Sequence, residues 1–370
     1  MNDMSLAAGT TVETAGAIDC DIHPGVPSTK VLLPYMDDYW RDQFVSRAID
    51  GLELASYPPN APITCRPDWR PANGKAGSDL SMMQSQALDA FGIRLAICNP
   101  LYGGQVAFSE TMAAVTCHAT NEWIAREWLD REPRLRASIV VSAQSPELAA
   151  EEIEARAGDR RFVQVLMLAS TEMLLGRRYH WPIYRAAERV GLPIGVHAGS
   201  MYRYAPTANG WPTHFVQDHA ANSNLFASQL QSLISEGTFQ KFPGLKMVLM
   251  ESGVTWVPAF MWRSDKTWRG TRGEIPWVTR PPSQILREHI RLTVQPIDAP
   301  PQPGHLERVI DQLGSDDMLL FSSDYPHWQF DGNEAMPRGL PKRLRQRILM
   351  DNALATYPRL AIPPSLETAP

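Results

Sequence analysis

The sequence predicts an α/β fold, a single TIM-like (β/α)8 barrel with long loops after strands 1 and 5. Short β-rich segments alternate with helical stretches, which is the pattern of βα units around a parallel sheet. The segment IHPGVPS after the first strand contains neither GxGxxG nor GxxxxGK, which disfavours a nucleotide-binding doubly wound sheet. The predicted strands cover residues 17–23, 94–99, 135–142, 162–168, 193–197, 246–251, 290–295 and 318–324.

The stretches between these strands have helix patterns, and several begin with Pro or follow Ser or Asp, as helix starts prefer. The long interruptions at 24–78 and 199–217 both follow predicted strands, on the connections from which barrel enzymes build their active sites. We expect helices at 80–91, 110–130, 146–157, 182–190, 218–235, 254–268, 283–288, 305–313 and 341–357.

The chain has 370 residues, of which 44% are hydrophobic, so it can bury a large core. A barrel takes about 250 residues, and the excess fits the two long loops. We find no internal repeat and no linker. The predicted organisation is therefore one (β/α)8 barrel at 17–360, between a flexible N-terminal segment at 1–16 and a C-terminal tail at 361–370.

Charge and hydropathy restrict the partners. The chain has 35 basic and 40 acidic residues without a long run of either sign, which argues against a nucleic acid or membrane partner and favours a small-molecule substrate. The first 16 residues lack a signal-peptide pattern and no apolar run of about 18 residues occurs, so we expect a cytoplasmic protein. The tryptophan-rich helix at 254–268 suggests a homo-oligomer, or a hetero-oligomer with a related chain.

The first predicted strand, AIDCDIH, alternates apolar and polar residues. Its polar face carries Asp19, Asp21 and His23. A parallel strand that is buried on both faces is normally apolar throughout, so these polar groups need partners. A metal ion at the end of the strand would supply them, and a buried hydrogen-bonded cluster is the alternative.

Other predicted strands also end in residues that bind metals. His197 ends strand 5 (IGVHAG), Glu251 ends strand 6 (MVLMESG), and strand 8 (FSSDYPH) ends in Asp324 with His327 just beyond. Each is weak alone, because a lone histidine is more often structural and an acidic residue often caps the next helix. Imidazole and carboxylate together suit zinc, manganese or iron. The expected ligands of a divalent ion at this rim are Asp21, His23, His197, Glu251 and Asp324.

Nearly the whole chain resembles the amidohydrolase-related family (amidohydrolase family 2), in the branch similar to aminocarboxymuconate-semialdehyde and γ-resorcylate decarboxylases. The resemblance rests on IDCDIHP, WPIYRAAERVGLPIGVHAG, FQKFPGLKMVLMESGVTWVP, LLFSSDYPHW and DNALATY. It implies a distorted (β/α)8 barrel and a metal-dependent hydrolase or decarboxylase. It places metal ligands at Asp21, His23, His197 and Asp324.

Two departures from the family pattern matter. The commoner motif on strand 1 is His-x-His, and Asp21-Ile22-His23 adds negative charge that favours manganese or iron over zinc. Many relatives carry a histidine as acid or base at the end of strand 6, where this chain has Glu251. A carboxylate there can transfer protons or bind or bridge metal, so the departure weakens the inference of a decarboxylase.

The number of metal ions is open. Strand 4 (FVQVLML) has no lysine, so a lysine-bridged metal pair is excluded and one ion is favoured. A pair bridged by Glu251 stays possible, because His214, His219 and His327 lie in or beside βα connections. We favour structural roles for the first two histidines and a functional role for His327.

The same ligand set supports two reactions. A divalent ion lowers the pKa of bound water from about 15.7 towards about 7, which supports hydrolysis with Asp324 as ligand and water-orienting base. In a decarboxylase the ion binds the substrate carboxylate while an acid protonates the ring carbon. The expected catalytic residues are Asp324, Glu251 and His327, and the expected pocket residues for a small organic acid or amide are Tyr325, Trp328 and Arg203.

The predicted function is a metal-dependent hydrolase or carboxy-lyase. The first alternative is a dinuclear iron or manganese-iron oxygenase on the same barrel. The second is a non-catalytic partner subunit of such an enzyme. The count and identity of bound metal ions separate these hypotheses.

Overall fold

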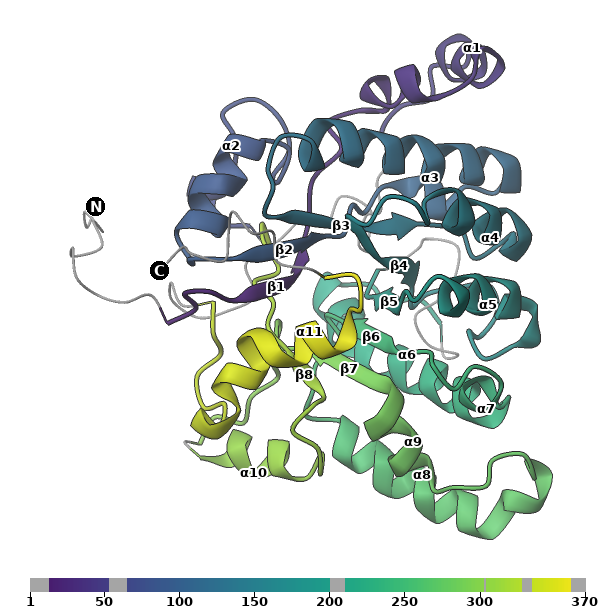
Figure 1. The fold of residues 1–370 in the computed structure, drawn as a ribbon, viewed down its shortest axis with the longest axis vertical. Coiled ribbons are helices and arrows are strands. Elements are labelled where there is room, and N and C mark those ends of the chain that lie inside the picture. Colours follow the sequence, from purple (N-terminus) through teal and green to yellow (C-terminus); the bar gives the residue numbers. More distant parts are fainter. Residues whose placement is uncertain (1–12, 53–64, 200–209, 303, 328–334, 361–370) are drawn as a thin grey trace.

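Eight parallel strands, paired in the order β1 to β8, form the barrel of this protein (Figure 1). The computed structural model describes residues 13–52, 65–199, 210–302, 304–327 and 335–360. Every strand falls within a range predicted from the sequence, so the predicted fold class is confirmed. The strands are β1 (Ile18–Ile22), β2 (Leu95–Cys98), β3 (Leu135–Val140), β4 (Phe162–Leu168), β5 (Ile194–His197), β6 (Met247–Met250), β7 (Ile290–Thr293) and β8 (Leu319–Leu320).

The chain that follows β8 closes the barrel against β1. The carbonyl of Phe321 accepts from the backbone N–H of Cys20 at 2.9 Å, and the carbonyl of Asp21 accepts from that of Asp324 at 3.0 Å. Regular strand geometry therefore ends sooner than the predicted 318–324, but the pairing with β1 continues. This closure brings Asp21 of β1 next to Asp324.

Helices surround the strands, and α1 lies at the edge of the molecule, within the long segment after β1 (Figure 1). The predicted helices are present with shifted bounds, whereas α1 and α7 were not predicted. The predicted ranges 80–91, 110–130 and 341–357 also contain π-helical turns at Gln84–Asp89, Ala125–Leu129 and Arg347–Asp351. The helices are α1 (Asp38–Ser46), α2 (Leu80–Met83), α3 (Glu110–Ile124), α4 (Pro146–Ala155), α5 (Trp181–Arg189), α6 (Phe215–Ser235), α7 (Thr238–Lys241), α8 (Val257–Thr271), α9 (Pro282–His289), α10 (His305–Asp311) and α11 (Asn352–Thr356).

Helix α6 begins three residues before its predicted start at 218. The side-chain oxygen Oε1 of Gln217 accepts from the backbone N–H of Thr213 at 3.0 Å and of His214 at 3.1 Å. These bonds satisfy free N–H groups at the helix start, so the first turn forms earlier than apolar periodicity indicates.

The inside of the barrel is filled by side chains. Alternate residues of several strands are fully buried together, as the two-residue period of a strand requires, and Tyr357, which follows α11, packs with them. A filled barrel leaves its active site to the strand ends and loops. The strand residues of this inner cluster include Ile18, Cys20, Leu95, Ile97, Val248 and Met250.

Strand β1 carries a bulge, which corrects the simple alternation expected for it. Asp19 pairs with Ala96 and Ile22 with Cys98, so three steps on β1 match two on β2. The carboxylate oxygen Oδ1 of Asp19 accepts from the backbone N–H of Asp21 at 3.2 Å and of Ser323 at 3.0 Å. Asp19 thus braces β1 against the segment after β8, and burial raises its pKa to about 7.

The ends of the chain fall partly outside the described residues. Of the predicted N-terminal segment, residues 13–16 are described. The Oγ1 of Thr14 donates to the carbonyl of Phe91 at 2.6 Å, and the N–H of Gly16 to that of Gly92 at 2.8 Å. Residues 1–12 and the predicted tail at 361–370 lie outside the described residues. Among the helices that the structure describes, none has the length and apolar character needed to cross a membrane.

Candidate metal centre

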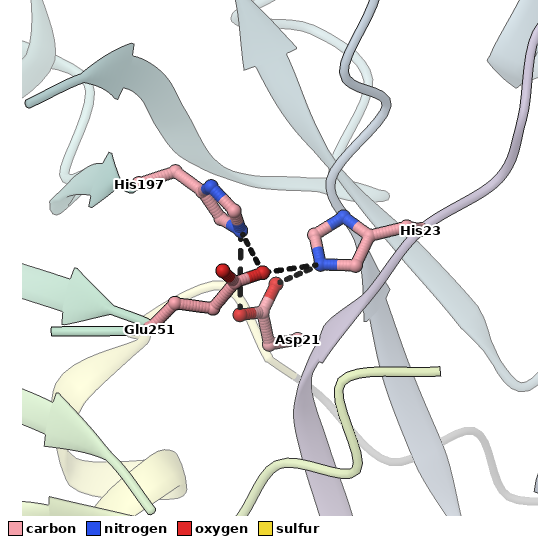
Figure 2. A group of neighbouring side chains, drawn as sticks. All are labelled: Asp21, His23, His197 and Glu251. Carbon is pink, nitrogen blue, oxygen red and sulfur yellow. Dashed lines mark ion pairs between the residues drawn. The ribbon is translucent and has the colours of Figure 1, made fainter. Parts of the chain in front are cut away.

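All five predicted metal ligands lie at the carboxyl ends of the strands, and His327 joins them. Figure 2 shows four of them pointing toward one another from β1, β5 and the end of β6. The ligand atoms form two overlapping groups, and within each group all atoms lie within 4.8 Å of one another. The first group is Asp21, His23, His197 and Glu251, and the second is His23, Glu251, Asp324 and His327.

The first group is held by short contacts between imidazoles and carboxylates. The Nε2 of His23 lies 3.3 Å from Oδ1 of Asp21 and 3.6 Å from Oε1 of Glu251. The Nε2 of His197 lies 3.2 Å from the same Glu251 oxygen and 3.7 Å from Oδ2 of Asp21. Two nitrogen and two carboxylate ligands thus surround one small space.

The second group extends the first toward the segment after β8. The Oδ1 of Asp324 lies 3.1 Å from both Nε2 of His23 and Nδ1 of His327. His327 is also 3.4 Å from Glu251, and its ring stacks on that of His23 with centroids 4.8 Å apart. Asp324, predicted as a ligand beside His197, therefore falls in the second group.

Left-handed backbone conformations orient two of the carboxylates. Glu251 has φ of 54° and Asp324 has φ of 59°, and among the described residues Ala48 is the one other non-glycine residue with positive φ. Such conformations are strained and concentrate at functional sites. The N–H of Glu251 donates to Oγ1 of Thr293 at 3.2 Å, which supports the turn after β6. The left-handed turns direct both side chains toward the cluster.

Both histidines of the first group are oriented through Nδ1. The Nδ1 of His23 lies 2.9 Å from the carbonyl oxygen of Asn99, and that of His197 contacts the carbonyl of Ala198. A carbonyl accepts only, so each Nδ1 carries a proton, and once the ring is neutral each Nε2 presents a lone pair. This is the tautomer that a metal-binding histidine needs.

Several buried atoms of the cluster have no hydrogen-bond partner among the described residues. Unpartnered buried polar atoms cost free energy, and here their lone pairs converge. A divalent cation would satisfy them, and a mixture of imidazole nitrogen and carboxylate oxygen suits zinc, manganese or iron. The residues therefore fit a divalent metal. The unpartnered atoms are Oδ2 of Asp21, Nε2 of His197, Oε1 of Glu251 and Oδ2 of Asp324.

Without a metal, the carboxylates of the cluster favour a proton on His197. Burial lowers the pKa of His197, but the carboxylates of Glu251 and Asp21 outweigh it and raise the pKa to about 9. Burial raises the pKa of Glu251, but His197 and His327 bring it well below its usual value. A bound cation would take the place of this proton, because metal ligands must be deprotonated.

Sequence reasoning missed Asn99. Its side-chain Nδ2 donates to Oδ1 of Asp21 at 2.8 Å. The one available signal was its place at the carboxyl end of the second predicted strand (RLAICN). An asparagine there is an ordinary turn residue until the pairing of β2 with β1 is known.

Two other histidines, for which structural roles were favoured, lie apart from the cluster. His214 is exposed at the start of α6, and His219 stacks on Phe215 with ring centroids 5.4 Å apart. Neither belongs to the two groups of candidate ligands. The Glu251-bridged metal pair loses these two candidates and keeps His327.

Of the three predicted pocket residues, the structure describes one, Tyr325. Tyr325 is fully buried, its hydroxyl donates to Oε1 of Gln86 at 2.8 Å, and its ring packs on Trp69. Trp328 and Arg203 lie outside the described residues. A cavity of about 220 Å³ opens beside the carboxyl ends of β3 and β4, lined in part by Leu168, the register partner of His197.

The parallel barrel and its histidine–carboxylate cluster are typical of metal-dependent barrel enzymes. The family model described as amidohydrolase matches residues 18–359. The chain belongs to this family. The resemblance noted in the sequence is thereby confirmed.

The chain is similar to several decarboxylases. The γ-resorcylate decarboxylase of Polaromonas sp. strain JS666 is 24% identical over 253 residues, covering 61% of this chain and 71% of that protein. The structure of dihydroxybenzoic acid decarboxylase from Polaromonas sp. JS666, with bound manganese and the inhibitor 2-nitroresorcinol, matches with a TM-score of 0.62 and 20% identity. The match covers 92% of this chain and 96% of that one.

A third relative is a 5-carboxyvanillate decarboxylase. Its structure from Novosphingobium aromaticivorans DSM 12444 is complexed with manganese and 4-hydroxy-3-methoxy-5-nitrobenzoic acid. It matches with a TM-score of 0.66 and 17% identity, over 93% of this chain and 96% of that one. At these identities the two structural matches show that the barrel fold is shared.

Proposed function

We propose that this protein is a manganese-dependent carboxy-lyase that removes carbon dioxide from a hydroxylated aromatic acid. The observation that carries the proposal is the convergence of buried, unpartnered lone pairs from Asp21, His197 and Glu251 at the mouth of the barrel. The donor set includes carboxylates from two strand ends, those of β1 and β6, which favours manganese over zinc. The manganese-bound decarboxylases that share this fold support the same metal.

The first group of ligands would hold the ion. Asp21 and His23 approach it from β1, His197 from β5 and Glu251 from the end of β6. A divalent ion in this place supplies positive charge to the carboxylate and the neighbouring hydroxyl of the substrate. With these four side chains fixed by burial, the bound substrate is oriented before any bond breaks.

The reaction needs a proton at the ring carbon. The bond between the ring and the carboxylate carbon breaks, the electron pair stays on the ring, carbon dioxide leaves, and a proton takes its place. We assign this proton to Nε2 of His327, because Nδ1 of the same ring is oriented by Asp324 at 3.1 Å. Burial lowers the pKa of His327, but Asp324 and Glu251 raise it well above its usual value, which favours the protonated form that a proton donor needs.

The substrate class is inferred from the relatives. The cavity of about 220 Å³ beside β3 and β4 is lined by none of the candidate metal ligands, so it does not carry this inference. The relatives named above act on dihydroxybenzoic acid, γ-resorcylate and 5-carboxyvanillate. None of these relatives supports the oxygenase alternative, which we do not propose.

An activity assay with the purified protein tests this function. Chelator-treated protein is loaded with Mn²⁺ and given γ-resorcylate or 5-carboxyvanillate, and the release of carbon dioxide and of the decarboxylated phenol is measured. We expect equal amounts of both products, and no turnover by the metal-free protein. Hydrolysis of an amide or ester in place of carbon dioxide release would contradict the carboxy-lyase and support a hydrolase.

A further inference from the structure

We propose that Asn99 is a positioning residue that sets the orientation of Asp21 for metal binding. The inference rests on the metal centre of the proposed function, but not on the reaction that this centre performs. Asn99 is fully buried at the carboxyl end of β2, directly beside the bulge of β1.

Asn99 contacts both ligands contributed by β1. Its Nδ2 donates to Oδ1 of Asp21 at 2.8 Å, and its backbone carbonyl accepts from Nδ1 of His23 at 2.9 Å. Its backbone N–H donates to the carbonyl of Ile22, between these ligands, at 2.8 Å. One residue of β2 thus orients the carboxylate through its side chain and the imidazole through its backbone.

The amide of Asn99 is locked in one of its two orientations. Its Oδ1 accepts from Oγ of Ser138 and from Nε2 of Gln164, the latter at 3.0 Å. A flipped amide would place Nδ2 against these two donors and Oδ1 against the carboxylate of Asp21. Both changes are unfavourable in a buried site, so Nδ2 must face Asp21.

The hydrogen bonds that fix the Asn99 amide continue across the barrel. Gln164 also donates from Nε2 to Oγ of Ser138 at 2.8 Å, and the hydroxyl of Tyr357 lies 3.3 Å from Oε1 of Gln164. We call this chain the polar relay, and its members are at most 1% exposed. The polar relay consists of Asp21, Asn99, Ser138, Gln164 and Tyr357.

The polar relay decides which oxygen of Asp21 is left for the cation. Asn99 occupies a lone pair of Oδ1, whereas Oδ2 has no hydrogen-bond partner and lies 3.7 Å from Nε2 of His197. Groups that orient a metal ligand by hydrogen-bonding to it typically contribute 10- to 100-fold to metal affinity. We expect Asn99 to contribute about this much.

The test compares two buried asparagines. Asn99→Leu removes the donor to Asp21 at similar volume and leaves the backbone contact with His23. Asn121→Leu is the matched control, because Asn121 on α3 is also fully buried. Its side chain bonds to the backbone of Val140 and to Glu152, away from the cluster. The measurements are Mn²⁺ dissociation constants by titration calorimetry of chelator-treated protein, and the thermal unfolding of each metal-free variant.

We expect Asn99→Leu to weaken Mn²⁺ binding about 10- to 100-fold and to change the electron paramagnetic resonance line shape of the bound Mn²⁺. We expect Asn121→Leu to keep the Mn²⁺ affinity and the line shape of the wild type. The two variants should both lose thermal stability. Equal dissociation constants for Asn99→Leu and the wild type, or equal weakening in both variants, would overturn the proposal.

A second variant covers the case in which Asn99→Leu does not fold. Ser138→Ala removes one donor to Oδ1 of Asn99 and is expected to weaken Mn²⁺ binding about five-fold, the value of one hydrogen bond. Unchanged binding in Ser138→Ala overturns the proposal. Wild-type protein that binds no Mn²⁺ overturns both the proposal and the metal centre, whereas Mn²⁺ binding without decarboxylation defeats the proposed reaction alone.

Discussion

Replacing His197 with alanine is expected to remove the bound ion and to lower kcat/KM for decarboxylation by about 10³-fold or more. His197 is 1% exposed and is the ligand contributed by β5, so no neighbouring side chain replaces its Nε2. A metal ion stabilises transition-state charge by several kcal/mol, which corresponds to a factor of this size. Metal content by mass spectrometry and the rate of carbon dioxide release measure the two effects.

His289→Ala is the matched control for this prediction. His289 is 2% exposed, its Nδ1 lies 2.8 Å from the carbonyl of Leu245, and its ring stacks on Phe239. It belongs to neither group of candidate ligands. We expect this variant to keep its metal and activity while losing stability. Metal content that is unchanged in His197→Ala, or lost equally in both variants, would show that the site is wrongly assigned.

Glu251→Gln is expected to weaken metal binding by at least about 10²-fold and to lower the pKa of His197 in the metal-free protein. The amide keeps the shape of the side chain but loses its charge. Residues that only hydrogen-bond to a metal ligand already contribute 10- to 100-fold to metal affinity. A charged ligand should therefore contribute at least as much. The Glu251 carboxylate is the first of the charges that raise the pKa of His197 to about 9, so titration by nuclear magnetic resonance should give a lower value.

The stability of the metal-free protein depends on pH through the protonation of His197. The folded-state pKa of His197, about 9, lies above its usual value of 6.5. Its protonation therefore stabilises the fold fully below pH 6.5, and this contribution is lost as the pH rises through about 9. In Glu251→Gln we expect the loss to finish at lower pH, as measured by thermal unfolding between pH 6 and 9.

Glu152→Gln serves as the control for Glu251→Gln. Glu152 is also largely buried and paired with a histidine, His118, at 2.8 Å, but it lies on α4 outside the cluster. We expect normal Mn²⁺ affinity in this variant. Wild-type affinity in Glu251→Gln would mean that Glu251 is not a ligand.

The strands and the site rim could be predicted because both depend on local patterns. Apolar segments bounded by turn residues mark the strands, and the carboxyl ends of parallel strands meet at one rim, so Asp21, His197 and Asp324 were expected together. Residue types that bind metals then stand out at those ends. The predictions of an oligomer and of a cytoplasmic location stay predictions.

The features that were missed depend on pairing between distant segments. The bulge of β1 is visible only in the register of β1 with β2, and the contact of Asp19 with the backbone of Ser323 only in the pairing of β1 with the segment after β8. The role of Asn99 needs four strands in register, because its amide is fixed by Ser138 on β3 and Gln164 on β4. Helix α1 follows a cap at Asp37 in a segment without strong apolar periodicity.

The most direct test of the metal centre is the anomalous scattering of crystals grown with Mn²⁺, measured on both sides of the manganese absorption edge. The account predicts an anomalous peak at the mouth of the barrel, with ligand distances of about 2.0–2.3 Å to Asp21, His23, His197 and Glu251. A peak elsewhere, or manganese-loaded crystals without density between these four side chains, would contradict it.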